Sequence, residues 1–584
     1  MRTKTSHKSN RTNGVLSFQQ KSHPLGNQKP FPVLEWLLLL CPFLFGCFFP
    51  WASALVSLVL ITLLFLLIRR GLLCCTYSAP FLAAASIVLF HLGGIFWGTD
   101  HGMALVGAVQ FLPFPLFILL IEQYTPEQRL NLLRRMPYTA SMMVVLSVLL
   151  SRFPLLEGWF LVAGRQSGFF QYPNTYAIYL LFALVLVLFS SPLRFGQLPW
   201  LILLTLGILL SGSRIVFFLL LVVFLVFFLT EKSKQSRLNV LVVAVPALLG
   251  SILYVLLTGS RESIGRFLTS SLTASEFVGR LLYAWDAIPV ILRHPLGLGY
   301  TGYRWLQGSF QTGVYSVQHV HNELLQLLLD VGWIPAGLFL WALWRGLRSP
   351  EGGVCRKLLL AVLLFHSLLD FDTQFISVAL LLFLVVDTEP KAETPHRFGL
   401  LAPVSLTVLA VLSLWLGSAS FLYYVRKPAS ALRVYPAYTA ALVDLLPDAS
   451  GQELGPLADR VLQLNQSIAL AHDARAEVDS SDGNFSGMCS HKQEAIRLSR
   501  YNLAEYLDYF DLLRCSRDLY LQTGDTVSAD RCMALIEEIP AMLEAADNQT
   551  SRLGQMIHDQ PNLILPPPYI SWMEKHAPGI VSIS

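Results

Sequence analysis

Two histidines stand at the end of a polar segment, directly before a run of apolar residues. His319 and His321 lie within the sequence HVHNELLQ at residues 319–326. A neutral imidazole can accept a proton from a hydroxyl group, as general-base catalysis of a glycosyl or acyl transfer requires. Because Asn322 and Glu323 follow it, His321 is expected in the first turn of a helix, whose positive N-terminus disfavours protonation. We predict His321 as the catalytic base and His319 as a second catalytic residue that orients it or binds acceptor; the alternative is two hydrogen-bonded surface histidines.

Three arginines, far apart in the sequence, are candidates for binding an anion. Arg165 lies in the sequence GRQSGFFQYPN, Arg214 follows the sequence SGS, and Arg280 lies in the polar segment before the histidines. An arginine at bilayer depth is costly unless it is paired or solvated. Its planar guanidinium donates bidentate hydrogen bonds to phosphate, so three of them can hold a diphosphate. For Arg214 the alternative is snorkelling to the lipid headgroups at the end of a span.

Two acids lie in the sequence HSLLDFD at residues 366–372, at the end of another apolar run. Acids at a membrane interface are costly, so Asp370 and Asp372 are expected to pair with an arginine of the site or to orient His321. We rank the structural ion pair above a catalytic role, and place Asn322 with these acids as supporting residues. No His, Cys, Asp or Glu spacing is convincing for a metal, and no cofactor is expected.

The rest of the sequence resembles a series of membrane spans. Of the 584 residues, 54% are hydrophobic and 14% are charged. The apolar residues recur in runs of about 17 to 25, the length that crosses a bilayer, and about thirteen such runs are present. These runs begin near residues 34, 51, 79, 102, 138, 175, 198, 215, 238, 324, 358, 374 and 400. The predicted fold is an all-α polytopic membrane protein, and the net charge of +4 gives no reason to expect a nucleic-acid partner.

Basic residues predict how the spans are oriented. The first 30 residues carry six Lys and Arg residues and no acid, so the N-terminus is expected in the cytoplasm. Every second connection is basic from there on, and an odd number of spans places the tail outside the cytoplasm. No cleavable signal peptide is expected, because a long polar leader precedes the first apolar run. This topology brings Arg165, Arg214, Arg280 and both histidines to the extracytoplasmic side of a plasma (inner) membrane.

The chain is predicted to have three parts. Residues 1–33 form a basic cytoplasmic tail, 34–424 the membrane domain with a large extracytoplasmic loop at about 259–320, and 425–584 an extracytoplasmic helical domain. The large loop is rich in arginine against the positive-inside trend, which indicates either an anionic ligand or a solvated helix. Its arginines are Arg261, Arg266, Arg280, Arg293 and Arg304.

The tail has a helical pattern. Apolar residues recur at helical spacing over 491–513 and 527–543, which predicts paired helices resembling tetratricopeptide-type hairpins. Such a domain either binds protein partners or is a cap that packs on the membrane domain. The Pro-rich residues 561–578 are expected to form irregular coil.

At these residues the chain resembles the O-antigen ligase and polymerase superfamily of bacterial envelope glycosyltransferases. The resemblance covers about residues 164–372. Its motifs are RQSGF with PN at 165–174, SR at 213–214, Arg280 with Trp285, HPLGLG at 294–299, and HN at 321–322 with Gly332. It implies a membrane domain of the glycosyltransferase C type and a metal-independent inverting transfer.

The resemblance also implies substrates and roles. A glycan carried on undecaprenyl diphosphate would pass to an acceptor hydroxyl on the extracytoplasmic face. Arg214 and Arg280 would hold the diphosphate, Arg165 would assist, and His321 would act as base or position the acceptor. Ligases and polymerases share this donor, so lipid A core, a growing polymer, a teichoic-type chain and a protein all remain open as acceptors.

Two other classes of protein fit parts of the pattern. A transporter or flippase of a lipid-linked saccharide would also have many spans and arginines, but internal repeats and a site near the midplane would be expected. A non-catalytic envelope scaffold would explain the helical tail, but it leaves the arginines and histidines without a role.

Overall fold

The structure is a computed structural model that describes residues 32–189, 195–242, 275–349, 353–386 and 399–576. It is 77% helical, and the described strands are β1 (Leu161–Val162) and β2 (Arg165–Gln166), which pair antiparallel. The predicted all-α class is confirmed. The basic N-terminal residues before residue 32, together with Arg261 and Arg266 of the large loop, lie outside the described residues.

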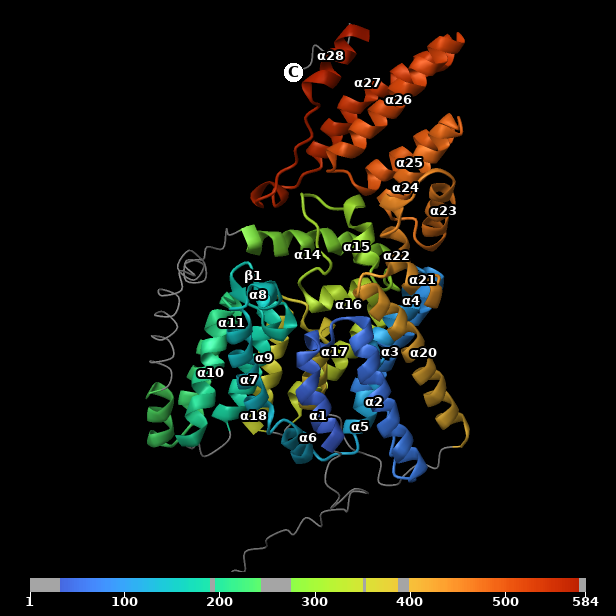
Figure 1. Ribbon diagram of the computed structural model, residues 1–584. Coiled ribbons are helices and arrows are strands. Elements are labelled where there is room, and N and C mark those ends of the chain that lie inside the picture. Colours follow the sequence, from blue (N-terminus) through green and yellow to red (C-terminus); the bar gives the residue numbers. More distant parts are fainter. Residues whose placement is uncertain (1–31, 190–194, 243–274, 350–352, 387–398, 577–584) are drawn as a thin grey trace, which may run out of the picture.

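Helices, most of them upright, form a bundle, which occupies the lower half of Figure 1. In chain order they are α1 (Pro32–Leu40), α2 (Pro50–Arg69), α3 (Ala79–Trp97), α4 (Ala104–Phe111), α5 (Pro113–Ile121), α6 (Pro126–Leu132), α7 (Met136–Leu150), α8 (Pro154–Phe160), α9 (Pro173–Leu188), α10 (Leu198–Leu210), α11 (Arg214–Thr230), α16 (Glu323–Val331), α17 (Trp333–Arg348), α18 (Gly353–Ser367), α19 (Ile376–Val385) and α20 (Leu401–Tyr424). Helices α14 (Ser275–Arg293) and α15 (Gly302–Leu306) lie above the bundle, and α14 runs across it.

Four helical segments are long and apolar enough to cross a membrane among the described residues: Pro50–Arg69, Ala79–Trp97, Ala104–Ile121 and Leu401–Tyr424. Five further apolar helices are shorter. The number of thirteen spans therefore stays a prediction. The run expected to begin at Leu324 is split at Gly332 into α16 and α17.

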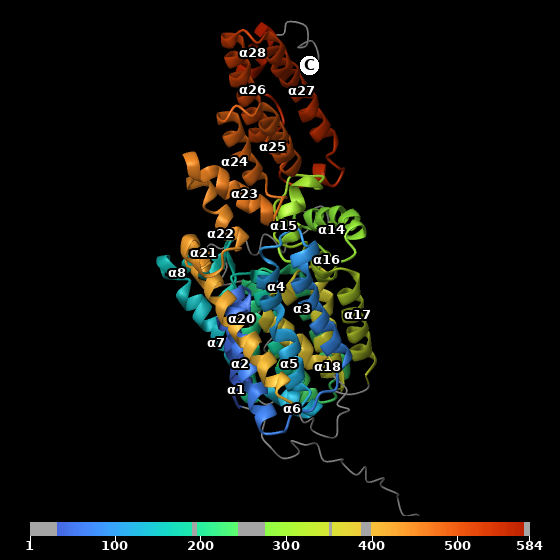
Figure 2. The same cartoon turned by 90° about the vertical axis from the view of Figure 1, so that its right-hand side faces the viewer.

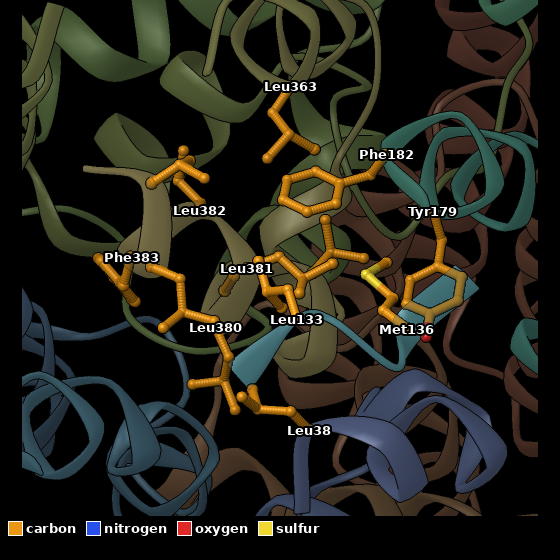
Figure 3. Packing of buried hydrophobic residues seen from close by; sticks show 14 of the residues in the cluster. Leu38, Leu133, Met136, Tyr179, Phe182, Leu363, Leu380, Leu381, Leu382 and Phe383 are labelled. Carbon is orange, nitrogen blue, oxygen red and sulfur yellow. The ribbon is translucent and has the colours of Figure 1, made fainter. Parts of the chain in front are cut away.

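Two helices at the centre of the bundle are buried on all sides. Every residue of α9 from Pro173 to Val185 is buried, and so is every residue of α19. A helix that is apolar all round is expected to be enclosed by other helices or by lipid. Figure 3 shows side chains of both helices, among them Phe182 and Leu381, packed with Leu363 of α18. The segments that lead into α9 and α19 carry the polar residues of the candidate site, so the apolar core holds those residues in place.

The tail extends the molecule beyond α14 and α15, as Figure 2 shows. Its helices are α21 (Pro428–Val434), α22 (Thr439–Val443), α23 (Leu454–Leu464), α24 (Ala469–Ser481), α25 (Phe485–Leu498), α26 (Leu503–Thr523), α27 (Thr526–Asn548) and α28 (Pro567–His576). Helix α24 packs on α25 and α26 packs on α27. The pattern predicted over 491–513 is interrupted, since α25 ends and α26 begins within it.

The expectation of irregular coil over 561–578 is wrong for residues 567–576, which form α28. Proline is tolerated in the first turn of a helix, where its missing N–H has no intrahelical partner. Trp572 of α28 packs against the ring of Phe510 in α26, with ring centroids 5.4 Å apart. This packing, which proline content does not predict, stabilises the helix.

The tail is fastened to the membrane domain at the turn between α3 and α4. The buried carboxylate of Asp100 accepts a hydrogen bond from Thr439 Oγ1 at 2.7 Å and one from Asn465 Nδ2 at 3.4 Å. Tyr435 donates its hydroxyl to the carbonyl oxygen of Gly102 at 2.8 Å. The first helices of the tail therefore form part of the upper face of the bundle.

Candidate active site

Asp370, in the loop between α18 and α19, is the centre of a polar cluster. Its side chain is fully buried. Tyr172 donates its hydroxyl to Oδ1 at 2.8 Å, and Asn174 Nδ2 donates to Oδ2 at 2.8 Å. The Arg280 guanidinium lies 3.5 Å from Oδ2, and His321 Nδ1 lies 3.4 Å from Oδ1. Both partners considered for this acid, an arginine of the site and His321, are in contact with it.

The charge of Asp370 follows from these contacts. Burial alone would raise the pKa of its carboxyl group, but His321 and Arg280 hold that pKa below its usual range. The group is therefore a carboxylate at neutral pH. A buried carboxylate needs such partners, because its charge is costly to remove from water.

His321 has an unusual backbone conformation. Its φ is +53°, in the left-handed region that residues other than glycine seldom adopt. The prediction that it lies in the first turn of a helix is wrong, because α16 begins at Glu323 with Asn322 as its N-cap. The imidazole lies beside Asp370, with Nδ1 3.4 Å from the carboxylate, and a proton on Nδ1 would leave Nε2 as the nitrogen that can accept a proton.

Asn322 holds this turn on both sides. Its Oδ1 accepts a hydrogen bond from the backbone N–H of Leu325 at 3.0 Å, and its Nδ2 donates to the carbonyl oxygen of Leu368 at 2.8 Å. Leu368 lies two residues before Asp370. The N-terminus of α16 and the Asp370 loop are therefore joined, and His321 and Asp370 are positioned together.

Arg165 is linked to Asp370 through the side chain of Asn174. Its Nε donates to the carbonyl oxygen of Ser211 at 2.8 Å, and its terminal nitrogen donates to Asn174 Oδ1 at 2.7 Å. Asn174 in turn donates to Asp370. Arg165 thus connects the β1–β2 hairpin, the turn before α11 and the start of α9.

Arg214 is joined to the site by α14. It is the first residue of α11, and its guanidinium lies 4.0 Å from Glu276 Oε2 in the first turn of α14. Glu276 and Arg280 are four residues apart and so share one face of that helix. The side chains of Arg214 and Arg280 remain 29% and 21% exposed, so a ligand can reach both guanidinium groups.

Asp372 belongs to a different cluster. It accepts a hydrogen bond from Thr175 Oγ1 at 3.0 Å and is paired with Nδ1 of His366, which is fully buried like Asp372 itself. The structure thus separates the two acids of one heptapeptide. Asp370 faces His321 and Arg280, whereas Asp372 fastens the end of α18 to the start of α9.

His319 forms no hydrogen bond with this cluster among the described residues. The Phe371 ring contacts both histidines, with centroids 4.8 Å from the His319 ring and 5.1 Å from the His321 ring. Burial, assisted by the nearby His321, lowers the pKa of His319 to about 3. His319 is therefore neutral at neutral pH, and it lines a cavity of about 660 Å³.

Some positioning residues were not predicted. Tyr172 donates to Asp370, and Glu323 accepts a backbone hydrogen bond from Thr373 at 3.1 Å, which holds α16 against the start of α19. Tyr172 and Glu323 lie in segments that also contain predicted site residues. This nearness in sequence is the signal that could have indicated them. Their contacts join segments about 50 to 200 residues apart and could not be found by spacing.

The HPLGLG motif at 294–299 acts through its backbone. Gly297 has a φ of +85°, and a Cβ there would lie 2.6 Å from the carbonyl oxygen of Asp330. Gly332 has a φ of +75°, and a Cβ there would lie 2.2 Å from the carbonyl oxygen of Pro295. This close approach fixes the end of α16 against the segment that follows α14. Among the described residues, no three His, Cys, Asp or Glu side chains form a metal-binding group.

One part of the chain matches a family of known proteins. Residues 199–342 match the family model of O-antigen ligase, a segment that includes Arg214, Arg280 and both histidines. No curated protein and no solved structure matches the chain. The motifs that carried the resemblance and this match agree on the same family. The chain therefore carries an O-antigen ligase domain at residues 199–342, and this match supports the predicted O-antigen ligase and polymerase superfamily and a role in polysaccharide assembly.

Proposed function

We propose that the protein transfers a glycan from undecaprenyl diphosphate to an acceptor hydroxyl on the extracytoplasmic face of the plasma membrane. The observation that carries this proposal is the contact of Asp370 with both Arg280 and His321, which puts a candidate base beside a candidate diphosphate ligand. The family match over residues 199–342 supports the same class of reaction.

The arginines stabilise the leaving group in this proposal. Arg280 and Arg214 bind the diphosphate, and Arg165 holds the turn before Arg214 in position. Negative charge develops on the diphosphate as its bond to the sugar breaks. Fixed guanidinium groups stabilise that charge without reorganising during the reaction. Because they supply the positive charge, we propose a metal-independent transfer.

His321 activates the acceptor. Asp370 holds Nδ1, so Nε2 removes the proton of the acceptor hydroxyl as its oxygen bonds to the anomeric carbon. The bond from that carbon to the diphosphate breaks, and its electron pair leaves with the diphosphate. Attack opposite the leaving group inverts the anomeric configuration. Asn322 keeps the imidazole in place, and Asp372 supports α9 and α18.

The predicted topology fits this scheme. About thirteen spans in a membrane domain of the glycosyltransferase C type, with a cytoplasmic N-terminus, place the site and the tail outside the cytoplasm. The acceptor is a glycan, a lipid or a protein, and the helical tail is available for protein partners.

The test is transfer of glycan from a lipid-diphosphate donor by the purified full chain in detergent with EDTA present. We expect transfer by the wild type and none by His321→Ala or Arg280→Ala, while the control His558→Ala, at a side chain 90% exposed, stays active. Thermal unfolding of each variant checks that it is folded. If no glycosidic product forms but the donor crosses the bilayer of proteoliposomes, the protein is a transporter and the proposal is wrong.

A further inference from the structure

The cavity that His319 lines is separate from the Asp370 cluster, since neither Asp370 nor His321 is among its lining residues. It has a volume of about 660 Å³, within the range of pockets that hold small ligands. Part of its wall comes from the junction of α20 with the tail, through Tyr423, Tyr424 and Tyr438. These residues lie outside the matched segment 199–342, so this wall is a feature of this chain beyond the O-antigen ligase domain.

Three residues of the cavity wall each carry a buried polar atom that has no hydrogen-bond partner in the described part of the chain. These atoms are Gln110 Oε1, Thr301 Oγ1 and His319 Nδ1. Gln110 Nε2 donates to the carbonyl oxygen of Phe48 at 2.9 Å, which sets the orientation of the amide. The three atoms are covered by neighbouring atoms, so a ligand in the cavity reaches them only when those neighbours move.

Aromatic rings make up much of the remaining wall. Phe48, Phe49, Trp159 and Tyr300 line the cavity together with the tyrosines of the tail junction. Broad apolar faces combined with a few placed hydrogen-bonding groups suit a ligand that has both apolar faces and hydroxyl groups. A sugar ring has this character, because its C–H groups form one face and its hydroxyl groups project from the edge.

Two guanidinium groups also line the cavity. Arg304 and Arg426 are exposed, and neither forms an ion pair with a carboxylate among the residues that the structure describes. Arg304 lies over the Trp305 ring at 5.1 Å, which restricts its motion. Arg426 has a φ of +59° and Thr301 a φ of +64°, so two lining residues keep strained backbones, a feature that gathers at ligand sites.

Asp330 is the one carboxylate among the residues that line the described cavity, and it is engaged elsewhere. It is buried, and its Oδ1 accepts a hydrogen bond from Gln326 Nε2 at 2.9 Å. Among the described residues it forms no ion pair with Arg304 or Arg426. The wall of the cavity favours a negatively charged ligand.

We propose that this cavity binds the acceptor saccharide and that Arg304 and Arg426 select one that carries a carboxylate or phosphate group. The proposal rests on the glycosyl transfer described above. His319 of the cavity wall and His321 both contact the Phe371 ring, so an acceptor held in the cavity lies near His321 while its charged group remains at the guanidinium groups. The tail contributes to acceptor choice because its junction with α20 builds the wall.

The experiment measures binding without any donor. Saturation-transfer-difference NMR is recorded on the full chain in detergent with methyl β-D-glucuronide, methyl β-D-galacturonide, methyl β-D-glucoside 6-phosphate and the neutral methyl β-D-glucoside. We expect at least one charged glycoside to bind about tenfold more tightly than the neutral one, and the double variant Arg304→Gln, Arg426→Gln to remove that difference. The glycosides that bind distinguish a carboxylate from a phosphate. Arg433→Gln is the matched control, since Arg433 is exposed and lies on α21 away from the cavity lining.

Equal binding of charged and neutral glycosides, or a double variant that binds like wild type, would overturn the proposal. So would displacement of every charged glycoside by phosphatidylglycerol in the micelle, which would identify a lipid site. Transfer that depends on His321 without any glycoside binding would contradict this inference alone. Binding that depends on Arg304 and Arg426 without any transfer would contradict the proposed function alone.

Discussion

The Asp370 cluster and the cavity that His319 lines differ in how their charged groups are paired. Around Asp370, the guanidinium of Arg280 and the imidazole of His321 are held by a buried carboxylate. Along the cavity of His319, the guanidinium groups of Arg304 and Arg426 have no carboxylate partner among the described residues. Paired charges in fixed positions suit a reaction step, because the environment is already arranged when charge develops. Unpaired guanidinium groups at an open cavity suit the selection of a ligand.

The largest expected effect comes from Asp370→Asn. It keeps the shape of the side chain but removes the charge that orients His321, so we expect kcat to fall by about 10³-fold or more. The control is Asp372→Asn, which changes the neighbouring acid and should mainly lower the melting temperature. Glycan transfer and thermal unfolding in detergent measure the two effects. Equal loss of kcat in both folded variants would mean that Asp370 has no special role.

Arg280→Gln should have the next largest effect. Loss of a charged donor that stabilises the leaving diphosphate is expected to lower kcat by about 10²-fold. Arg214→Gln should cost less, because the described contact of Arg214 is with an exposed glutamate at 4.0 Å. Steady-state kinetics with varied donor concentration measure both. A larger effect at Arg214 than at Arg280 would reverse the proposed order of the two arginines.

The variant Arg304→Gln, Arg426→Gln should act on the acceptor and not on the chemical step. We expect KM for the acceptor to rise about tenfold while kcat at saturating acceptor stays near the wild-type value. If instead kcat falls with KM unchanged, these arginines serve the chemical step. The contrast between the Asp370 cluster and the cavity then fails.

The smallest expected effect is the pH dependence of stability that His319 contributes. Its folded pKa is lowered to about 3 by burial, so between about pH 3 and the ordinary pKa near 6.5 the unfolded chain binds a proton that the folded chain does not. Stability from this residue is therefore present above the ordinary pKa and falls as pH decreases. The melting temperature of His319→Gln should change less between pH 7.5 and pH 4.5 than that of wild type. An identical change of melting temperature in both proteins would contradict the lowered pKa of His319.

The sequence by itself determined the fold class, the family and the types of residue that can do chemistry. Long apolar runs predict helices because each backbone polar group in a membrane must be satisfied within its own segment. The sequence shows four polar residues beside such runs, where a charge is costly unless it is paired or solvated. They are Arg214, Arg280, His321 and Asp370.

Only the tertiary structure decided which of these residues meet. Asp370 and Asp372 are two residues apart, yet one faces His321 and the other His366, because the 3-10 turn η6 (Asp372–Gln374) begins at the second of them. His319 and His321 diverge because His321 takes a left-handed backbone. The cavity joins residues from α2 to the tail junction, hundreds of positions apart. The spacing of residues along the chain does not predict such contacts. They depend on how the helices pack in three dimensions.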